Sequence, residues 1–259
     1  MPRDETDPIN DKPMPLLDHL VELRRRLMWS GGAFFIAFLV CYFFSGQIYN
    51  FLAAPLAEIM RQKGQEPRLI YTVLYEVFFT HVKVAVFAAA FITFPIAATQ
   101  LWLFIAPGLY RSEKRAILPF LIASPVLFVM GAALGYYVVF PFAWKFFLSF
   151  ETPPTPNGVQ IQLFATVSAY LSLVMKLIFA FGITFQLPVL LSLLAKVGLV
   201  SARQLASKRR YAYVGCFVVA AVLAPPDVFT QTGLAVPLIL LYELSIFAAR
   251  WVEPKPLPD

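Results

Sequence analysis

Long apolar stretches separated by short polar segments occupy most of this chain of 259 residues. Most of these stretches are long enough to cross the roughly 30 Å hydrocarbon core of a bilayer as a helix. The pattern therefore predicts an all-α integral membrane protein with six transmembrane helices. The six predicted spans are 27–44, 77–105, 117–140, 166–195, 211–224 and 230–249.

The last two predicted spans are short. Span 211–224 holds about 14 residues, which make only about 21 Å of helix. The turn Pro225-Pro226-Asp227 separates it from span 230–249. Helices this short require a locally thinned membrane or longer neighbours that shield them. We therefore expect a concave bundle whose fifth and sixth helices are short.

The six spans form one predicted domain, 16–250, between two polar ends. Residues 1–15 contain acids and prolines and are expected to be a disordered tail, and 251–259 form a second tail. We expect no cleavable signal peptide, because the first apolar run is long and has no small-residue exit site.

Two segments outside the spans have amphipathic helical patterns. In 16–27 the leucines recur on one stripe, and Glu22 lies on the polar face. In the connection 45–75, apolar side chains recur at helical spacing, which predicts a short helix on the far membrane surface. These side chains are Ile48, Phe51, Leu52, Leu56 and Ile59.

Prolines and glycines inside the spans predict local features of the helices. Pro95 should kink the second span. The fourth span is longer than the membrane is thick, so it must tilt, kink at Pro188 or project outward. Gly131 and Gly135 form a G-x-x-x-G pattern, which permits a close contact between two helices.

The charged residues indicate how the chain is oriented. They make up 14% of it, against roughly 25% in soluble domains, and most of the cations fall in segments on one side of the predicted membrane. The positive-inside rule therefore places both termini in the cytoplasm. The cations on this side are Arg3, Lys12, Arg24, Arg25, Arg26, Arg111, Lys114, Arg115, Lys196, Arg203, Lys208, Arg209, Arg210, Arg250 and Lys255, and those on the opposite side are Arg61, Lys63, Arg68 and Lys145.

A basic loop between the second and third spans carries a single acid. The loop 104–115 holds a Pro-Gly turn, three cations and Glu113, and Glu22 lies on the same predicted side, before three arginines. A planar guanidinium matches a carboxylate bidentately, so two such acids suit a ligand with paired arginines. Two simpler interpretations stay open. Glu22 could pair with Arg25 or Arg26 on its own helix, and Glu113 could satisfy the N-terminal dipole of the third span.

Other functional classes have weaker support. The chain has no H-E-x-x-H, nucleophile elbow, P-loop or nucleotide-binding glycine pattern, so we expect no enzymatic activity. An ion-coupled secondary transporter of small solutes is the alternative, although no internal repeat is evident. A structural subunit without a site of its own is a third class. The polar residues inside the spans are scattered, and they are Lys83, Gln100, Lys176, Gln186 and Glu243.

The side chains that bind metals are few. Cys41 and Cys216 both lie deep inside apolar runs, where cysteine behaves as a small hydrophobic residue. The only histidines are His19 and His81, and neither belongs to a Cys/His cluster. We therefore expect no disulfide, no metal site and no cofactor.

Four motifs occur in order along the chain, between about residue 16 and residue 250. They are His19-Leu20-x-Glu22-Leu23-Arg24-x-Arg26, Phe104-x-x-Pro107-Gly108-Leu109-Tyr110-x-x-Glu113-x-Arg115, Phe181-Gly182-x-x-Phe185-Gln186-x-Pro188 and Pro225-Pro226-Asp227-x-x-x-Gln231. Their joint spacing in a six-span layout resembles the TatC family, the multispanning receptor of the twin-arginine protein translocase.

The resemblance implies a function directly. It implies that the chain binds the paired-arginine signal peptides of folded precursor proteins at the cytoplasmic face of the bacterial inner membrane. It also implies a multimeric complex with the single-span proteins TatB and TatA, driven by the proton-motive force, and no nucleic-acid partner. The implied signal-peptide-binding residues are Glu22, Arg24, Phe104, Tyr110 and Glu113.

The resemblance also implies residues that contact partner subunits. These are Gln186, Pro55, Asp227 and Gln231, for which a structural role is an equal alternative except at Gln186. Many family members carry Glu at the position that matches Gln186. A neutral amide can bond polar groups of TatA or TatB, or a signal-peptide backbone, but it cannot titrate. This departure argues against a proton-coupled role at that site.

Overall fold

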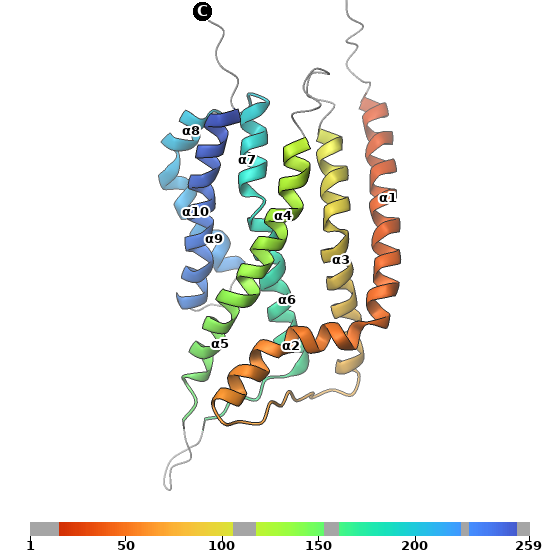
Figure 1. The fold of residues 1–259 in the computed structure, drawn as a ribbon, viewed down its shortest axis with the longest axis vertical. Coiled ribbons are helices and arrows are strands. Elements are labelled where there is room, and N and C mark those ends of the chain that lie inside the picture. Colours follow the sequence, from red (N-terminus) through yellow and green to blue (C-terminus); the bar gives the residue numbers. More distant parts are fainter. Residues whose placement is uncertain (1–15, 106–117, 153–160, 224–227, 253–259) are drawn as a thin grey trace, which may run out of the picture.

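The computed structural model describes residues 16–105, 118–152, 161–223 and 228–252, and within these ranges the regular elements are helices, apart from isolated bridges. The long helices run roughly side by side, with α1 and α3 at one edge and α9 and α10 at the other (Figure 1). They are α1 (Leu16–Phe43), α2 (Ser45–Gln62), α3 (Glu76–Ile105), α4 (Leu118–Leu134), the π-helical turn η3 (Gly135–Val139), α5 (Phe140–Leu148), α6 (Val167–Thr184), α7 (Leu187–Lys196), α8 (Ala202–Ser207), α9 (Arg209–Leu223) and α10 (Val228–Val252).

Five helical segments of the described chain are long and apolar enough to cross a membrane. They correspond to the first four and the last of the predicted spans. The predicted fifth span corresponds to α9, whose 15 residues reach only about 22 Å. The prediction of a short fifth helix is therefore confirmed, whereas the count of six transmembrane helices stays a prediction. The five segments are Leu20–Phe43, Glu76–Phe104, Pro119–Leu148, Val167–Lys196 and Thr230–Val252.

The length of α10 corrects the prediction of a short sixth helix. This helix has 25 residues, enough for about 37 Å. It begins at Val228, before the predicted span, and continues past Arg250 to Val252. The prediction ended the helix at the last apolar residue before Arg250, although a long cation at a helix end needs only to reach the interface. The concave shape of the bundle stays a prediction.

The third predicted span is longer than expected. α4 continues through η3 into α5, so the helical segment extends to Leu148 rather than ending near residue 140. The apolar pattern places the end of the span at 140, but the next residue, Pro141, stands in the first turn of α5. The turn before it is the π-helical η3, and a local π-helical adjustment of this kind allows a continuous helix to accommodate a proline.

The fourth predicted span consists of two helices. α6 ends at Thr184, and α7 begins at Leu187. Pro188 has no N–H to donate to the carbonyl four residues earlier, so the helix is interrupted in front of it. This interruption matches the expectation of a kink at Pro188. α3, in contrast, is continuous through Pro95, and a kink there stays a prediction.

Close packing between α4 and α6 confirms the contact predicted from the glycine pair. A Cβ atom on Gly131 would lie 2.5 Å from the backbone oxygen of Phe181, and one on Gly135 would lie 3.0 Å from the ring of Phe181. From the opposite helix, a Cβ atom on Gly182 would lie 2.6 Å from the ring of Phe128. Glycines on both helices therefore allow a distance that no larger residue permits.

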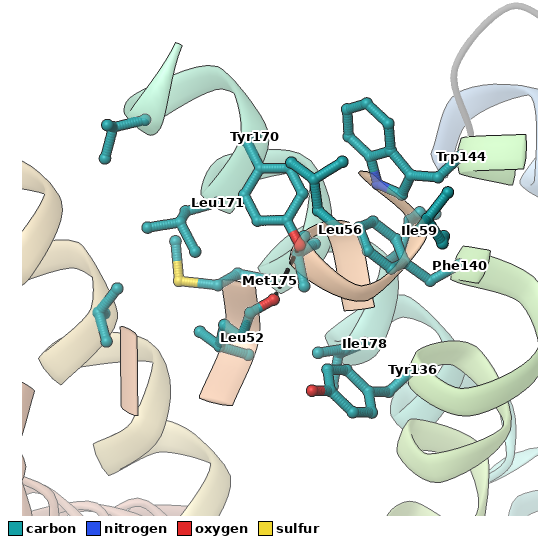
Figure 2. Packing of buried hydrophobic residues seen from close by; sticks show 14 of the residues in the cluster. Leu52, Leu56, Ile59, Tyr136, Phe140, Trp144, Tyr170, Leu171, Met175 and Ile178 are labelled. Atoms are coloured by element: carbon teal, nitrogen blue, oxygen red, sulfur yellow. Dashed lines mark hydrogen bonds between the residues drawn. The ribbon is translucent and has the colours of Figure 1, made fainter. Parts of the chain in front are cut away.

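The apolar face of α2 packs against the bundle. Leu52, Leu56 and Ile59 are buried together with residues of η3, α5 and α6. Figure 2 shows Tyr170 directed at this face, where its hydroxyl donates to the carbonyl of Leu52 at 2.9 Å. The helix predicted between the first two spans is thus confirmed, and Leu52, Leu56 and Ile59 of its apolar side are covered by protein. α2 crosses the end of the bundle opposite to the start of α1 (Figure 1).

Candidate functional site

Glu22 forms an ion pair within α1. The Nε and Nη2 atoms of Arg26 donate to its Oε1 atom at 3.0 Å and 2.5 Å. The two side chains are 25% and 22% exposed, so water reaches them only partly. The simpler interpretation left open from the sequence, a pair with Arg26 one turn further on, is therefore confirmed as a contact.

A residue of α3 completes this cluster. The Nη1 atom of Arg26 donates to the Oε1 atom of Gln100 at 3.2 Å. α1 and α3 lie side by side, with the start of α1 and the end of α3 at the same end of the molecule (Figure 1). A cavity of about 340 Å³ lies beside these side chains, between α1 and α3. It is lined by Glu22, Arg25, Arg26, Trp29, Gln100 and Leu103.

The other residues predicted to bind a signal peptide divide into two groups. Arg24 is exposed on α1, and Phe104 is half-buried in the last turn of α3, four residues after Gln100. The described structure thus brings Arg24 and Phe104 to the end of the bundle that holds Glu22. Tyr110 and Glu113 lie outside the described residues, so the expected proximity of Glu22 and Glu113 stays a prediction.

Gln186 is bonded inside the chain. The hydroxyl of Ser124 donates to its Oε1 atom at 2.5 Å, and its Nε2 atom donates to the backbone oxygen of Ser124 at 3.0 Å. These bonds join α4 to the interruption between α6 and α7. No local pattern in the sequence predicts this pairing, because Ser124 is 62 residues away. The predicted contact between Gln186 and a partner subunit stays a prediction.

Pro55 has a visible structural effect. It lies inside α2 and has no N–H to donate to the carbonyl of Phe51, four residues earlier. The hydroxyl of Tyr136 donates to that carbonyl at 2.5 Å, and the rings of Phe51 and Tyr136 stack at 4.8 Å. Pro55 therefore leaves the carbonyl oxygen of Phe51 free of its helical hydrogen bond, and Tyr136 of η3 binds α2 through this oxygen.

The residues predicted at the turn before the last helix are described only in part. The Nε2 atom of Gln231 donates to the carbonyl of Phe217 at 3.4 Å, which connects α10 to α9. Asp227 lies outside the described residues. A structural role for Gln231 therefore has direct support, and its partner-contact role stays a prediction.

The acid inside the last span has a partner that the sequence did not reveal. Glu243 of α10 accepts from both Nε and Nη2 of Arg209 at 2.7 Å, and from the hydroxyl of Tyr213 at 2.7 Å. The sequence indicates only that Glu243 needs a partner, because a charge inside a membrane span is expected to be paired. The location of the partner, 34 residues earlier, depends on the packing of α9 against α10.

The lysines inside the spans also have contacts. Lys176 donates to the carbonyl of Val222 at 3.3 Å, in the last turn of α9, and Lys83 donates to the hydroxyl of Ser168 at 3.5 Å. The ammonium of Lys176 therefore stabilises the negative end of the short helix.

The described residues show no arrangement typical of a metal centre. In that part of the chain no group of three or more His, Cys, Asp or Glu side chains could hold an ion. Cys41 and Cys216 are buried free thiols, which matches their interpretation as small hydrophobic residues.

Comparisons with known proteins agree on one family. The model of the Sec-independent protein translocase protein (TatC) family matches residues 18–237. The chain is similar to Sec-independent protein translocase protein TatC from Magnetococcus marinus, with 54% identity over 93% of this chain and 86% of the relative. It is also similar to the TatC proteins of Rickettsia prowazekii (46% identity, 91% of this chain and 92% of the relative) and Escherichia coli K12 (40% identity, 93% and 90%).

The fold is similar to a solved structure. The crystal structure of the twin arginine translocase receptor TatC superposes with a TM-score of 0.76 at 39% identity, covering 90% of this chain and 99% of that one.

The fold and the comparisons together define the class: this is a multi-pass, all-helical membrane component of a Sec-independent protein translocase. Within that class, the chain belongs to the TatC family. The members of this family named here are components of a protein translocase.

Proposed function

We propose that this chain is the core receptor subunit of a twin-arginine translocase. It binds paired-arginine signal peptides of folded precursors at the cytoplasmic face and assembles with TatB and TatA for export driven by the proton-motive force. Membership of the TatC family and the similar solved receptor support this role. The membrane is the bacterial inner membrane, with both termini on the cytoplasmic side.

The observation that carries the proposal is the position of the Glu22 carboxylate and its contacts with a guanidinium. It lies at one end of the bundle, it is partly shielded from water, and it already binds a guanidinium through two nitrogens. A site that holds one guanidinium in this geometry has the shape and charge to hold that of an incoming arginine. Partial shielding matters, because a fully exposed ion pair contributes only ~0–1 kcal/mol.

The predicted orientation is consistent with this role. The start of α1 and the ends of α3, α7 and α10 lie at one end of the bundle (Figure 1). The segments near that end carry most of the cations of the sequence. By the positive-inside rule this end faces the cytoplasm, where signal peptides arrive.

Loss of either acid should weaken peptide binding. We expect Glu22→Ala and Glu113→Ala each to reduce photocrosslinking to a paired-arginine signal peptide by about tenfold, because a charge-assisted hydrogen bond contributes ~1.5–3 kcal/mol. Membrane insertion should stay normal. Glu58→Ala is the matched control, since Glu58 is an exposed acid on α2 at the opposite end. Crosslinking that stays at the wild-type level in both variants would exclude recognition by these acids.

A second experiment tests the partner contact proposed at Gln186. Ile183 and Leu190 are exposed, and they lie three residues before and four residues after Gln186, on the two sides of the interruption between α6 and α7. A photocrosslinker at position 183 or 190 should therefore capture TatB or TatA, whereas one at the buried Phe181 should not. If neither exposed position formed a crosslink in assembled complexes, Gln186 would have a structural role only.

A further inference from the structure

The guanidinium of Arg26 fills the place that the proposed function assigns to a peptide arginine. It donates to Glu22 through Nε and Nη2 and to Gln100 through Nη1. Three of its nitrogens are therefore engaged, by two residues of different helices. An ordinary ion pair between neighbouring turns of one helix has no such second anchor.

The cavity around this pair is suited to one guanidinium group. The carboxylate of Glu22 supplies the charge, the amide oxygen of Gln100 supplies a further acceptor, and the indole of Trp29 lines the same cavity. Trp29 is largely exposed, and an indole face attracts guanidinium groups. Carboxylate and amide thus form a guanidinium subsite that Arg26 occupies in this structure, and Trp29 forms part of the cavity wall beside it.

We propose that Arg26 is an internal ligand of the subsite formed by Glu22 and Gln100, and that an arginine of the signal peptide binds by displacing it. This inference rests on the proposed function, because it assumes that Glu22 receives the peptide. It adds a regulatory element, since the receptor holds its own competitor. A weakly basic segment that cannot displace Arg26 stays unbound.

Competition of this kind has a quantitative signature. An internal competitor reduces the fraction of receptor with a free carboxylate, and it therefore raises the apparent Kd of every Glu22-dependent ligand by one common factor. Removing the competitor should lower the apparent Kd by that same factor. A residue that positions Glu22 has the opposite signature, because its removal weakens binding.

The test uses the purified full-length protein in lipid nanodiscs and a fluorescent signal peptide with paired arginines. For Arg26→Gln we expect an apparent Kd about threefold to tenfold lower than wild type, the range between an exposed and a partly buried charged pair. Arg25→Gln is the charge-matched control. Arg25 lines the same cavity, but the described structure gives the ion pair with Glu22 to Arg26. Its removal should give a clearly smaller shift.

Two further variants separate the possible outcomes. Glu22→Gln should weaken binding, and the double variant Glu22→Gln/Arg26→Gln should bind as weakly as Glu22→Gln alone. If Arg26→Gln weakens binding, Arg26 positions Glu22 and the inference is wrong. Equal gains for Arg26→Gln and Arg25→Gln would reduce the effect to overall charge, and no gain would also overturn the inference. Wild-type affinity of Glu22→Gln would instead refute the proposed function at this site.

Discussion

Replacement of Gly131 by valine is expected to destabilise the bundle by about 3 kcal/mol. The first added atom would lie 2.5 Å from the backbone oxygen of Phe181 and 2.7 Å from the ring of Phe185. A backbone oxygen cannot rotate away as a side chain can, so α4 and α6 would have to separate. The midpoint of thermal unfolding of the purified protein in detergent measures this loss.

Gly31→Val is the matched control for this prediction. Gly31 lies on α1, and a Cβ atom there would have no heavy atom within 4 Å. The same substitution should therefore leave the unfolding midpoint unchanged or raise it slightly, because valine has a higher helix propensity than glycine. A similar loss in both variants would mean that valine, and not the clash with α6, is responsible.

Replacement of Tyr170 by alanine should cost about 3–5 kcal/mol of stability. Tyr170 is 2% exposed, and its ring lies 5.3 Å from that of Trp144 and 5.7 Å from that of Phe140. Its hydroxyl also binds α2 through Leu52, as Figure 2 shows. The substitution removes both the ring packing and this bond, so the packing of α2 against the bundle should loosen. Thermal unfolding and limited proteolysis within α2 report the two effects.

Tyr170→Phe separates the ring from the hydroxyl. It keeps the aromatic packing and removes only the hydrogen bond, so a loss of about 1 kcal/mol is expected. If the phenylalanine variant lost as much stability as the alanine variant, the hydroxyl rather than the ring would hold α2. If the alanine variant lost none, the packing described around Tyr170 would not stabilise the fold.

The sequence predicted most accurately those elements whose ends are marked locally. The second span was predicted at 77–105, and α3 extends over Glu76–Ile105. The short α9 was also predicted, because a basic loop and a Pro-Pro turn flank it. The errors lie at helix ends that no local signal marks. The third span was predicted to end at 140, but the helix continues through Pro141 to Leu148, and the last span was predicted to end before Arg250, but α10 continues to Val252.

The candidate site was predictable only in its local part. The pair of Glu22 and Arg26 follows from a spacing of four residues on one helix. The contact between Arg26 and Gln100 spans 74 residues, and it depends on how α1 packs against α3. The bond between Ser124 and Gln186 depends in the same way on packing, across 62 residues. No periodicity in a single sequence contains these distances.

The way α1 is attached has a mechanical consequence. Only 6% of its apolar window is buried, against 33% to 56% in the other four such segments. Of the five apolar clusters formed by the described residues, only the small one around Cys41 includes residues of α1, which contribute Cys41 and Phe38. Among the five apolar segments of the described chain, the helix that carries Glu22 therefore has the least surface buried against its neighbours, and it is held mainly along α3. A force transmitted through a peptide bound at Glu22 would thus act first on the contact between α1 and α3.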